Sequence, residues 1–135
     1  MAWKNYPCRR KAAVSYKKYG NKMIEADGEI FDSKKEYRRW NELILLVKAG
    51  EISHLKRQVK YELIPAQREA DITGPRGGIR RGKLIEREVA YVADFVYTDK
   101  SGQIVVEDCK GLRTKEYILK RKMMLFFHGI RIKET

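Results

Sequence analysis

The sequence has few of the residues and patterns that define secreted or membrane proteins. Its 135 residues include two cysteines, Cys8 and Cys109, which are too few for a disulfide framework, so we expect a reducing, cytoplasmic environment. The longest apolar runs, 43–47 and 123–127, are far shorter than the ~20 residues that cross a bilayer. The first residues are polar and cationic, and we expect no secretory signal. The composition therefore excludes a disulfide-rich secreted domain and a protein anchored by a membrane-spanning helix.

Acidic residues are outnumbered as well. Lysine and arginine total 30 against 18 aspartate and glutamate residues, which gives a net charge of +12. This balance is typical of proteins that bind a polyanion, most often a nucleic acid, because each neutralised phosphate releases condensed counterions. We find no helix with a cationic face and exposed Trp, Phe and Leu side chains of the kind that lies on membranes, so we expect no membrane partner.

Residues 1–22 contain no acidic residue, and their cations are interleaved with Trp3, Tyr6, Tyr16 and Tyr19. Aromatic rings beside cations suit stacking on bases as well as contact with phosphates. The same pattern fits a solvated segment whose aromatic rings pack back on the domain. We interpret 1–22 as a basic N-terminal segment that precedes a single domain over 23–135.

The first half of that domain predicts a hairpin, a helix and a strand. Two short runs around Asp27-Gly28 indicate a hairpin over 22–31. The helix begins at Asp32 or Ser33 and ends at Gly50, and its buried stripe consists of Trp40, Leu43, Ile44 and Val47. A strand over 58–64 follows and ends at Pro65.

The second half predicts a flexible loop and a further set of strands and helix. Residues 68–88 show no periodicity and are broken by glycine and proline, so we expect a flexible basic loop. Strands over 89–97 and 104–110 form a hairpin. A second helix begins at Thr114, with Tyr117, Leu119, Met123 and Met124 on its buried side, and a last strand covers 130–132. The order of hairpin, helix, three strands, helix and strand predicts an α/β fold.

Two acidic residues lie inside the predicted strand pair. Side chains alternate along a strand, so Asp108 shares its face with Lys110. In one register Asp94 lies opposite Val106 and diagonal to Asp108, and in another it lies directly opposite Asp108. Both registers leave the two carboxylates on one face, with their Cβ atoms roughly 5–8 Å apart.

Like charges this close on a half-buried sheet need a cation between them. Mg²⁺ fits, because it takes oxygen ligands and retains several waters. Lys110 emerges beside that position, where it could orient or deprotonate a water or hold a phosphate. Glu36, on the buried stripe of the first helix, is the candidate for a third carboxylate. Two plainer roles stay open: Ser33 and Glu36 also form a capping-box pattern, and Lys110 could form a simple salt bridge with Asp94.

The pattern of Asp94 and Asp108-Cys109-Lys110 on adjoining strands, preceded by a helical Glu36, resembles the PD-(D/E)XK nuclease superfamily. The segments YVADFVY (91–97) and VVEDCKG (105–111), with Thr114, look like a phage- and prophage-encoded family of small nucleases. Those nucleases are related to Holliday junction resolvases and to the endonuclease subunit of certain transposases. The similarity covers about 28–122, and the placement of the motif on two adjacent strands makes it more specific than a bare D…DxK match.

The resemblance implies a restriction-endonuclease-like core of helix, three antiparallel strands, helix and strand. It also implies that Mg²⁺, or Mn²⁺ in its place, is held by Asp94, Asp108 and the main-chain carbonyl of Cys109. Glu36 would support the metal or its water, and Lys110 would assist the nucleophile. Ala93 replaces the proline of the superfamily's name, at a position that is not a ligand. Glu107 adjoins Asp108, but the spacing to Lys110 and the alternation of faces both select Asp108.

We expect DNA contacts from two cationic regions, although a solvated helix face is the other interpretation of the second. The loop contributes Arg76, Arg80, Arg81 and Lys83. The start and exposed face of the second helix, whose N-terminus offers free amides to a phosphate, contribute Arg113, Thr114, Lys115, Lys120, Arg121 and Lys122. Gln58 is a further candidate site residue.

These features predict a metal-dependent DNA endonuclease, located in the host cytoplasm if a phage encodes it. The chain has no separate domain for reading a base sequence, which favours branched or junction DNA as the substrate. A four-way junction needs two symmetric cuts, so we expect a homodimer. The alternatives are a non-catalytic basic nucleic-acid-binding protein, in which Asp94 and Lys110 form a buried ion pair, and a structural subunit of a nucleoprotein complex.

Overall fold

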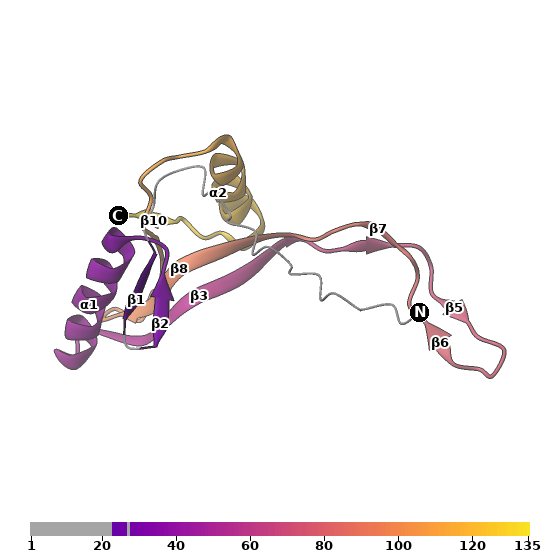
Figure 1. Ribbon diagram of the computed structural model, residues 1–135, viewed down its shortest axis with the longest axis horizontal. Coiled ribbons are helices and arrows are strands. Elements are labelled where there is room, and N and C mark those ends of the chain that lie inside the picture. Colours follow the sequence, from indigo (N-terminus) through magenta and orange to yellow (C-terminus); the bar gives the residue numbers. More distant parts are fainter. Residues whose placement is uncertain (1–22, 27) are drawn as a thin grey trace, which may run out of the picture.

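The computed structural model describes residues 23–26 and 28–135, so the basic segment 1–22 and Asp27 lie outside the described residues. The described part contains two helices and a four-stranded sheet, from which a narrow β-ribbon extends to one side (Figure 1). The predicted order of hairpin, helix, three strands, helix and strand is present, with four further short strands between the first and second of the three. The fold is therefore mixed α/β.

The hairpin leads directly into the first helix. Strands β1 (Ile24–Ala26) and β2 (Glu29–Phe31) pair in antiparallel fashion. In the turn, Gly28 has a φ of +78°, a left-handed conformation that glycine adopts at little cost. Phe31 is buried, and its ring meets that of Tyr37 edge-on at a centroid distance of 5.1 Å.

Helix α1 (Lys34–Lys48) begins at the predicted capping box. Ser33 Oγ accepts the backbone N–H of Glu36 at 3.1 Å, and Glu36 Oε2 accepts the backbone N–H of Asp32 at 2.9 Å. This reciprocal pair of hydrogen bonds satisfies two donors that the helix itself leaves without acceptors.

The buried stripe of α1 differs from the predicted one. Leu43 is fully buried, with Trp40 and Leu46 packed around it. Val47, which was expected in the stripe, is 40% exposed, so that part of the prediction is wrong. The buried stripe consists of Trp40, Leu43 and Leu46, which are three residues apart, so Leu46 occupies the position that was expected for Val47.

The central sheet has the strand order β10-β9-β8-β3. Strands β3 (Ile52–Ile64), β8 (Val89–Asp99) and β9 (Ile104–Asp108) are antiparallel neighbours. The last strand, β10 (Lys133–Glu134), pairs in parallel with β9. It was expected at 130–132 and that prediction is wrong, because Ile130 and Ile132 pack into the apolar core instead.

The two helices pack on the sheet through separate apolar clusters. One lies under α1 and contains Leu43, Ile52, Phe95 and Tyr97. The other lies under α2 (Lys115–His128) and contains Leu63, Tyr91, Ala93, Val106, Tyr117, Met124 and Ile132. Leu119 was expected on the buried side of α2 but is 59% exposed, so the outer face of this helix carries apolar groups as well as cations.

Residues 67–86, which we call the arm, form a β-ribbon rather than the predicted irregular loop. Strand β4 (Gln67–Arg68) pairs with β7 (Leu84–Glu86), and β5 (Ile72–Thr73) pairs with β6 (Ile79–Arg80). Ladders of two or three residues are too short to show alternation, which is why the sequence gives no sign of them. The arm extends β3 and β8 away from both helices (Figure 1).

Within the described part of the chain, neither helix is long and apolar enough to cross a membrane.

Candidate functional site

The register between β8 and β9 brings the two predicted acids together. Phe95 pairs with Glu107 and Val96 pairs with Val106, and the same register places Asp94 opposite Asp108. Of the two registers that the sequence allows, this is the one with the carboxylates directly opposed. The backbone N–H of Cys109 donates to Asp94 Oδ2 at 2.8 Å, which ties the Asp94 carboxylate to the end of β9.

Asp108 is fully buried and has no exposed surface. The Tyr91 hydroxyl donates to its Oδ2 at 2.5 Å, and Lys110 Nζ lies 3.0 Å from its Oδ1 as an ion pair. Burial, and then the adjacent Asp108 carboxylate, raise the pKa of Tyr91 far above its ordinary value, so this hydroxyl remains a donor. Lys110 Nζ also lies 4.8 Å from the centre of the Tyr117 ring. The lysine is therefore paired with Asp108 and not with Asp94.

Asp94 has a strongly perturbed proton affinity. Burial, and then the negative charges of Asp108 and Glu36, raise the pKa of Asp94 from 3.8 to about 7. The hydrogen bond from Cys109 and the charge of Lys110 act in the opposite direction and are outweighed. This shift means that the acids sense one another's charge, as expected if they form one site.

Glu36 is buried, and its two oxygens face different partners. Oε2 caps the helix, whereas Oε1 accepts Gln58 Nε2 at 3.2 Å and lies 3.5 Å from the guanidinium of Arg57. Gln58 Nε2 also lies 3.5 Å from Asp94 Oδ1. The capping role is thus real, and the same side chain is linked through Gln58 to the acidic pair.

Gln58 itself has an unusual backbone, with a φ of +49°. Only glycine, and to a lesser degree asparagine and aspartate, adopt this region readily, and such residues cluster at functional sites. Gln58 lies opposite Asp94 in the β3–β8 register. The strained position places its amide between Glu36 and Asp94.

A cleft of about 370 Å³ opens beside these residues. It lies where α1 and α2 both begin, and its lining comprises Asp32, Ser33, Glu36, Asp94, Cys109, Lys110, Gly111, Leu112 and Thr114. Thr114 caps α2 by accepting the backbone N–H of Tyr117 at 3.1 Å. The cleft therefore combines carboxylates and a lysine with the positive ends of two helix dipoles.

Within residues 23–26 and 28–135, no group of three or more His, Cys, Asp or Glu side chains is arranged to hold a metal ion. Tyr91, the Cys109 amide and the Asp32 amide each donate to one carboxylate oxygen, of Asp108, Asp94 and Glu36 respectively. The donor set still suits a hard divalent cation. Asp108 Oδ1 is buried and accepts no hydrogen bond in the described structure, where it forms an ion pair with Lys110 Nζ at 3.0 Å. The pKa of Asp94 is raised by burial first and by the charges of Asp108 and Glu36 after it.

The predicted DNA-binding residues fall into two regions that the structure keeps apart. Arg76, Arg80, Arg81 and Lys83 are exposed on the arm, and Lys115 and Lys122 are exposed on α2. Other cations of this set form ion pairs: Lys120 with Glu116 at 3.0 Å, and both Arg113 and Arg121 with Glu134. Glu134 is a partner that the sequence analysis did not identify.

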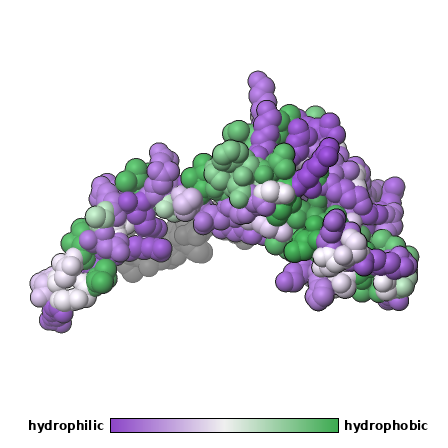
Figure 2. All heavy atoms as spheres, turned by 180° about the vertical axis from the view of Figure 1, so that it is seen from behind, coloured by the Kyte–Doolittle hydropathy of each residue, from purple (hydrophilic) through white to green (hydrophobic). Residues whose placement is uncertain are grey.

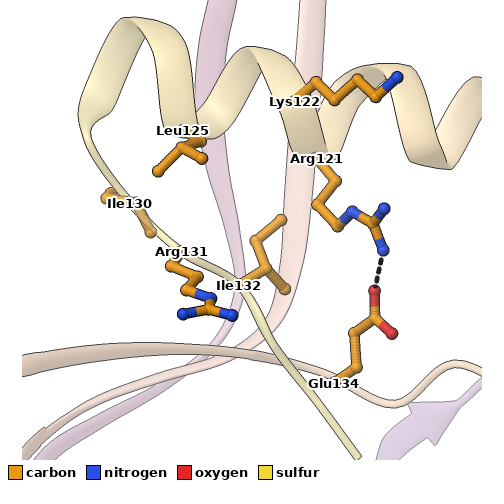
Figure 3. Close-up of a pocket in the computed structure, with 7 residues that line it drawn as sticks. All are labelled: Arg121, Lys122, Leu125, Ile130, Arg131, Ile132 and Glu134. Atoms are coloured by element: carbon orange, nitrogen blue, oxygen red, sulfur yellow. Dashed lines mark hydrogen bonds and ion pairs between the residues drawn. The ribbon is translucent and has the colours of Figure 1, made fainter.

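A second cavity, of about 500 Å³, lies between the end of α2 and the approach to β10 (Figure 3). Its lining is Arg121, Lys122, Leu125, Ile130, Arg131, Ile132 and Glu134. Figure 3 shows Arg121 directed at Glu134, and their charged atoms lie 2.8 Å apart. None of the four predicted catalytic residues lines this cavity, so Arg121 and Lys122 belong to a surface separate from the acidic cleft.

A buried ion-pair network, missed by the sequence analysis, lies on the other face of β9. Glu107 accepts Arg39 Nε at 2.5 Å and the Tyr97 hydroxyl at 2.8 Å. Burial alone would raise the pKa of Glu107, but the hydrogen bonds from Arg39 and Tyr97 outweigh it and hold that pKa below its ordinary value. Glu107 is thus a structural acid, and the alternation of faces had already excluded it from the site. No signal in the sequence indicated the partner of Glu107, because Arg39 lies 68 positions away and meets it only through tertiary packing.

Comparison with known proteins gives one family and no named relative. A family model described as a protein of unknown function (DUF1064) matches residues 16–133. No curated protein and no solved structure matches the chain. Since that model spans most of the sequence, including every residue of the acidic cleft, the chain belongs to the DUF1064 family, whose function is unknown.

Proposed function

We propose that this chain is a metal-dependent DNA endonuclease with a restriction-endonuclease-like core. One observation carries the proposal: the β8–β9 register sets Asp94 opposite Asp108, with Lys110 Nζ 3.0 Å from Asp108 Oδ1. The presence of Glu36 in the same cleft and the sheet order β10-β9-β8-β3 support it.

The cleft residues, together with Asp108, which is buried behind the cleft and does not line it, suit hydrolysis of a phosphodiester bond. Asp94 and Asp108, with the carbonyl of Cys109, would hold Mg²⁺ or Mn²⁺, and Glu36 would support it. Such an ion polarises the scissile phosphate and lowers the pKa of an attacking water. Lys110 would stabilise charge on the phosphate or hold the water. The first turns of both helices would favour a bound phosphate through their dipoles and free backbone amides.

Branched DNA is the substrate class that we propose. The described residues form one four-stranded sheet with two helices, a short hairpin and the arm. Their predicted DNA-binding cations lie on projecting parts, the arm and α2. Resolution of a four-way junction requires a two-fold homodimer that presents two clefts. Equilibrium sedimentation with junction DNA tests this. A monomer would exclude junction resolution and leave a flap- or nick-directed nuclease.

The nuclease proposal is tested with labelled linear, flap, fork and four-way DNA in Mg²⁺, Mn²⁺ or a chelator. Metal-dependent cleavage of branched substrates is expected. Asp94→Asn and Asp108→Asn should each abolish cleavage while DNA affinity stays equal or rises, because each removes a metal ligand and a repulsion with phosphate. Lys110→Ala should lose roughly 10²–10⁴-fold in rate, as is typical for an acid–base or charge-stabilising group.

Glu51→Gln is the matched control, since Glu51 pairs with Lys100 at the surface and lies outside the cleft lining. It should cleave like the wild type. Metal-dependent cleavage by folded Asp94→Asn or Asp108→Asn protein would refute the site assignment.

One observation favours the non-catalytic alternative. Lys110 is already paired with Asp108, and each acid has internal hydrogen-bond donors, as in a purely structural cluster. A basic binding protein built this way would bind DNA equally well in chelator and in Mg²⁺ and would cut none of the substrates. The cleavage panel separates the two functions directly.

A further inference from the structure

The arm has a specified structure of its own. At its middle, the N–H of Gly82 donates to Asp71 Oδ1 at 2.9 Å, and the N–H of Glu69 donates to the carbonyl of Lys83 at 2.9 Å. A Cβ atom on Gly82 would lie 1.9 Å from the carbonyl oxygen of Glu69. The two strands therefore approach one another at a point that only glycine permits.

The outer part of the arm carries an excess of cations. Residues 72–83 contain Arg76, Arg80, Arg81 and Lys83 and no acidic residue. All four side chains are exposed, and within the described residues none of them has an ion-pair or hydrogen-bond partner. Among the acids of the arm, Asp71 and Glu69 lie level with Gly82 and Lys83, and Glu86 lies nearer the sheet. Beyond Asp71, residues 72–80 form the tip of the arm, which carries Arg76 and Arg80 and no acidic residue.

The same tip exposes large apolar side chains. Ile72 is 63% exposed and Ile79 is 78% exposed. Ile72 pairs with Arg80 and Thr73 pairs with Ile79, so one isoleucine lies on each face of the ribbon. Figure 2 shows hydrophobic side chains among hydrophilic ones along the projecting arm. A two-stranded ribbon by itself is marginally stable in water and has no core, so exposed isoleucines do not stabilise it by packing.

We propose that the arm is a DNA wedge that recognises branch points. Ile72 or Ile79 inserts between bases where stacking is already broken, and the four cations hold the flanking phosphates. Apolar side chains combined with cations are the means by which architectural proteins unstack and bend DNA. This proposal rests on the proposed function only in that DNA is the partner. It adds that the branch point is the feature of the DNA that the arm recognises.

Charge favours DNA over a second copy of the chain as the occupant of the tip. The chain carries a net charge of +12, so a second copy would bring mostly like charge to a tip that carries only cations. A branched DNA offers negatively charged phosphates to the cations. At its branch, the bases also cost less free energy to unstack than bases inside a duplex. Contact between copies is therefore an outcome that the test must detect.

The test uses a fork and a four-way junction with 2-aminopurine at the branch, in chelator so that no strand is cut. Wild-type protein should raise the fluorescence at saturation, because unstacking relieves quenching of the base. The double variant Ile72→Ser, Ile79→Ser should reduce this rise at least fivefold, while anisotropy shows linear-duplex affinity within twofold of wild type. Ile79→Leu keeps an apolar tip and should retain the rise. Ile104→Ser, at an isoleucine that is 69% exposed on β9, is the matched control and should also retain it.

The outcomes separate this inference from the nuclease proposal. An unchanged rise in the double serine variant, or no rise with bound wild-type protein, would overturn the wedge. A loss of dimer in that variant would also overturn it and would assign the tip to contact between copies. If wild-type protein unstacks the branch but cuts nothing in Mg²⁺, the wedge stands and the nuclease proposal fails.

Discussion

The acidic cleft should make the stability of the fold fall as the pH rises toward neutrality. The pKa of Asp94 is about 7 in the folded protein and 3.8 as its ordinary value, which applies to the unfolded chain. The folded state therefore binds this proton more tightly than the unfolded state. The resulting stabilisation is fully present below about pH 4 and is lost as the pH rises through about 7.

The magnitude follows from the size of the shift. One pKa unit corresponds to about 1.4 kcal/mol, so the slope should approach about 1.4 kcal/mol per pH unit in the middle of the window. Over the whole window the loss amounts to about 4 kcal/mol, a large share of the roughly 5–15 kcal/mol that stabilises a domain. Groups whose pKa is lowered, such as Glu107, lose their contribution only at more acidic pH.

Urea unfolding in chelator at pH 5, 6, 7 and 8 measures this effect, with tryptophan fluorescence as the signal because Trp40 stacks on Phe95 at 6.0 Å in the core. The wild-type midpoint should fall with pH. Asp94→Asn should remove most of the slope and exceed the wild type in stability at pH 8, whereas Glu51→Gln should keep the wild-type slope. Parallel pH profiles for wild type and Asp94→Asn would refute the reasoning.

Added Mg²⁺ provides the complementary measurement without any cleavage assay. A cation held by the cleft carboxylates competes with the proton, so Mg²⁺ should raise the wild-type midpoint at pH 8. The gain is about 2.7 kcal/mol at a hundredfold excess over the dissociation constant. Asp94→Asn should show a much smaller gain. Equal gains in both proteins would show that Mg²⁺ acts elsewhere.

Three further predictions concern single contacts. Glu36→Gln retains an oxygen that can accept the Asp32 N–H at the helix cap but loses the negative charge. The rate of DNA cleavage should therefore drop markedly, with little change in the urea midpoint. An unchanged cleavage rate would leave capping as the only role of Glu36. Gly82→Ala should separate the two strands of the arm without removing any charge, because the new Cβ would lie 1.9 Å from the Glu69 carbonyl oxygen. Trypsin should then cut after Arg80 or Arg81 faster than in the wild type. Equal cutting rates would contradict the close approach of the strands. Arg39→Met leaves the buried Glu107 without its main partner and should cost about 3–5 kcal/mol in urea unfolding. A loss below about 1 kcal/mol would show that Tyr97 and Lys133, whose Nζ lies 3.7 Å from Glu107 Oε2, suffice.

The acidic pair could be predicted because strand periodicity is robust where one face of a strand is buried. Tyr91, Ala93, Phe95 and Tyr97 alternate as core residues along β8, and the turn at 99–102 limits the register to a few choices. The sequence could not choose between two registers, since both satisfy the alternation. The observed pairing of Phe95 with Glu107 decides it.

The start of β3 could not be predicted, because a bulge hides it. His54 has a φ of +53°, and the register with β8 shifts between Ser53 and Lys56. A shift of this kind changes which face each following residue occupies, so the alternation visible from Gln58 onward does not extend back to Ile52. The same limit applies to the partners of Asp108 and Glu107, since Tyr91 and Arg39 meet them only through tertiary packing.

The β-ribbon of the arm could not be predicted for a different reason, which lies in its glycines. Its glycines suggested a break in structure, whereas Gly77 forms a turn with a φ of +75° and Gly82 allows two strands to touch. Glycine marks both irregular loops and close backbone approach, and only the fold tells the two apart.

The arm also changes how the protein moves through solution. A compact chain of this length has a radius of gyration of about 14 Å, but the arm carries part of the mass well outside the sheet and helices (Figure 1). An elongated particle experiences more friction than a sphere of equal mass. A monomer should therefore elute early from a sizing column and resemble a compact dimer, so the mass has to be taken from light scattering or equilibrium sedimentation, which are independent of shape.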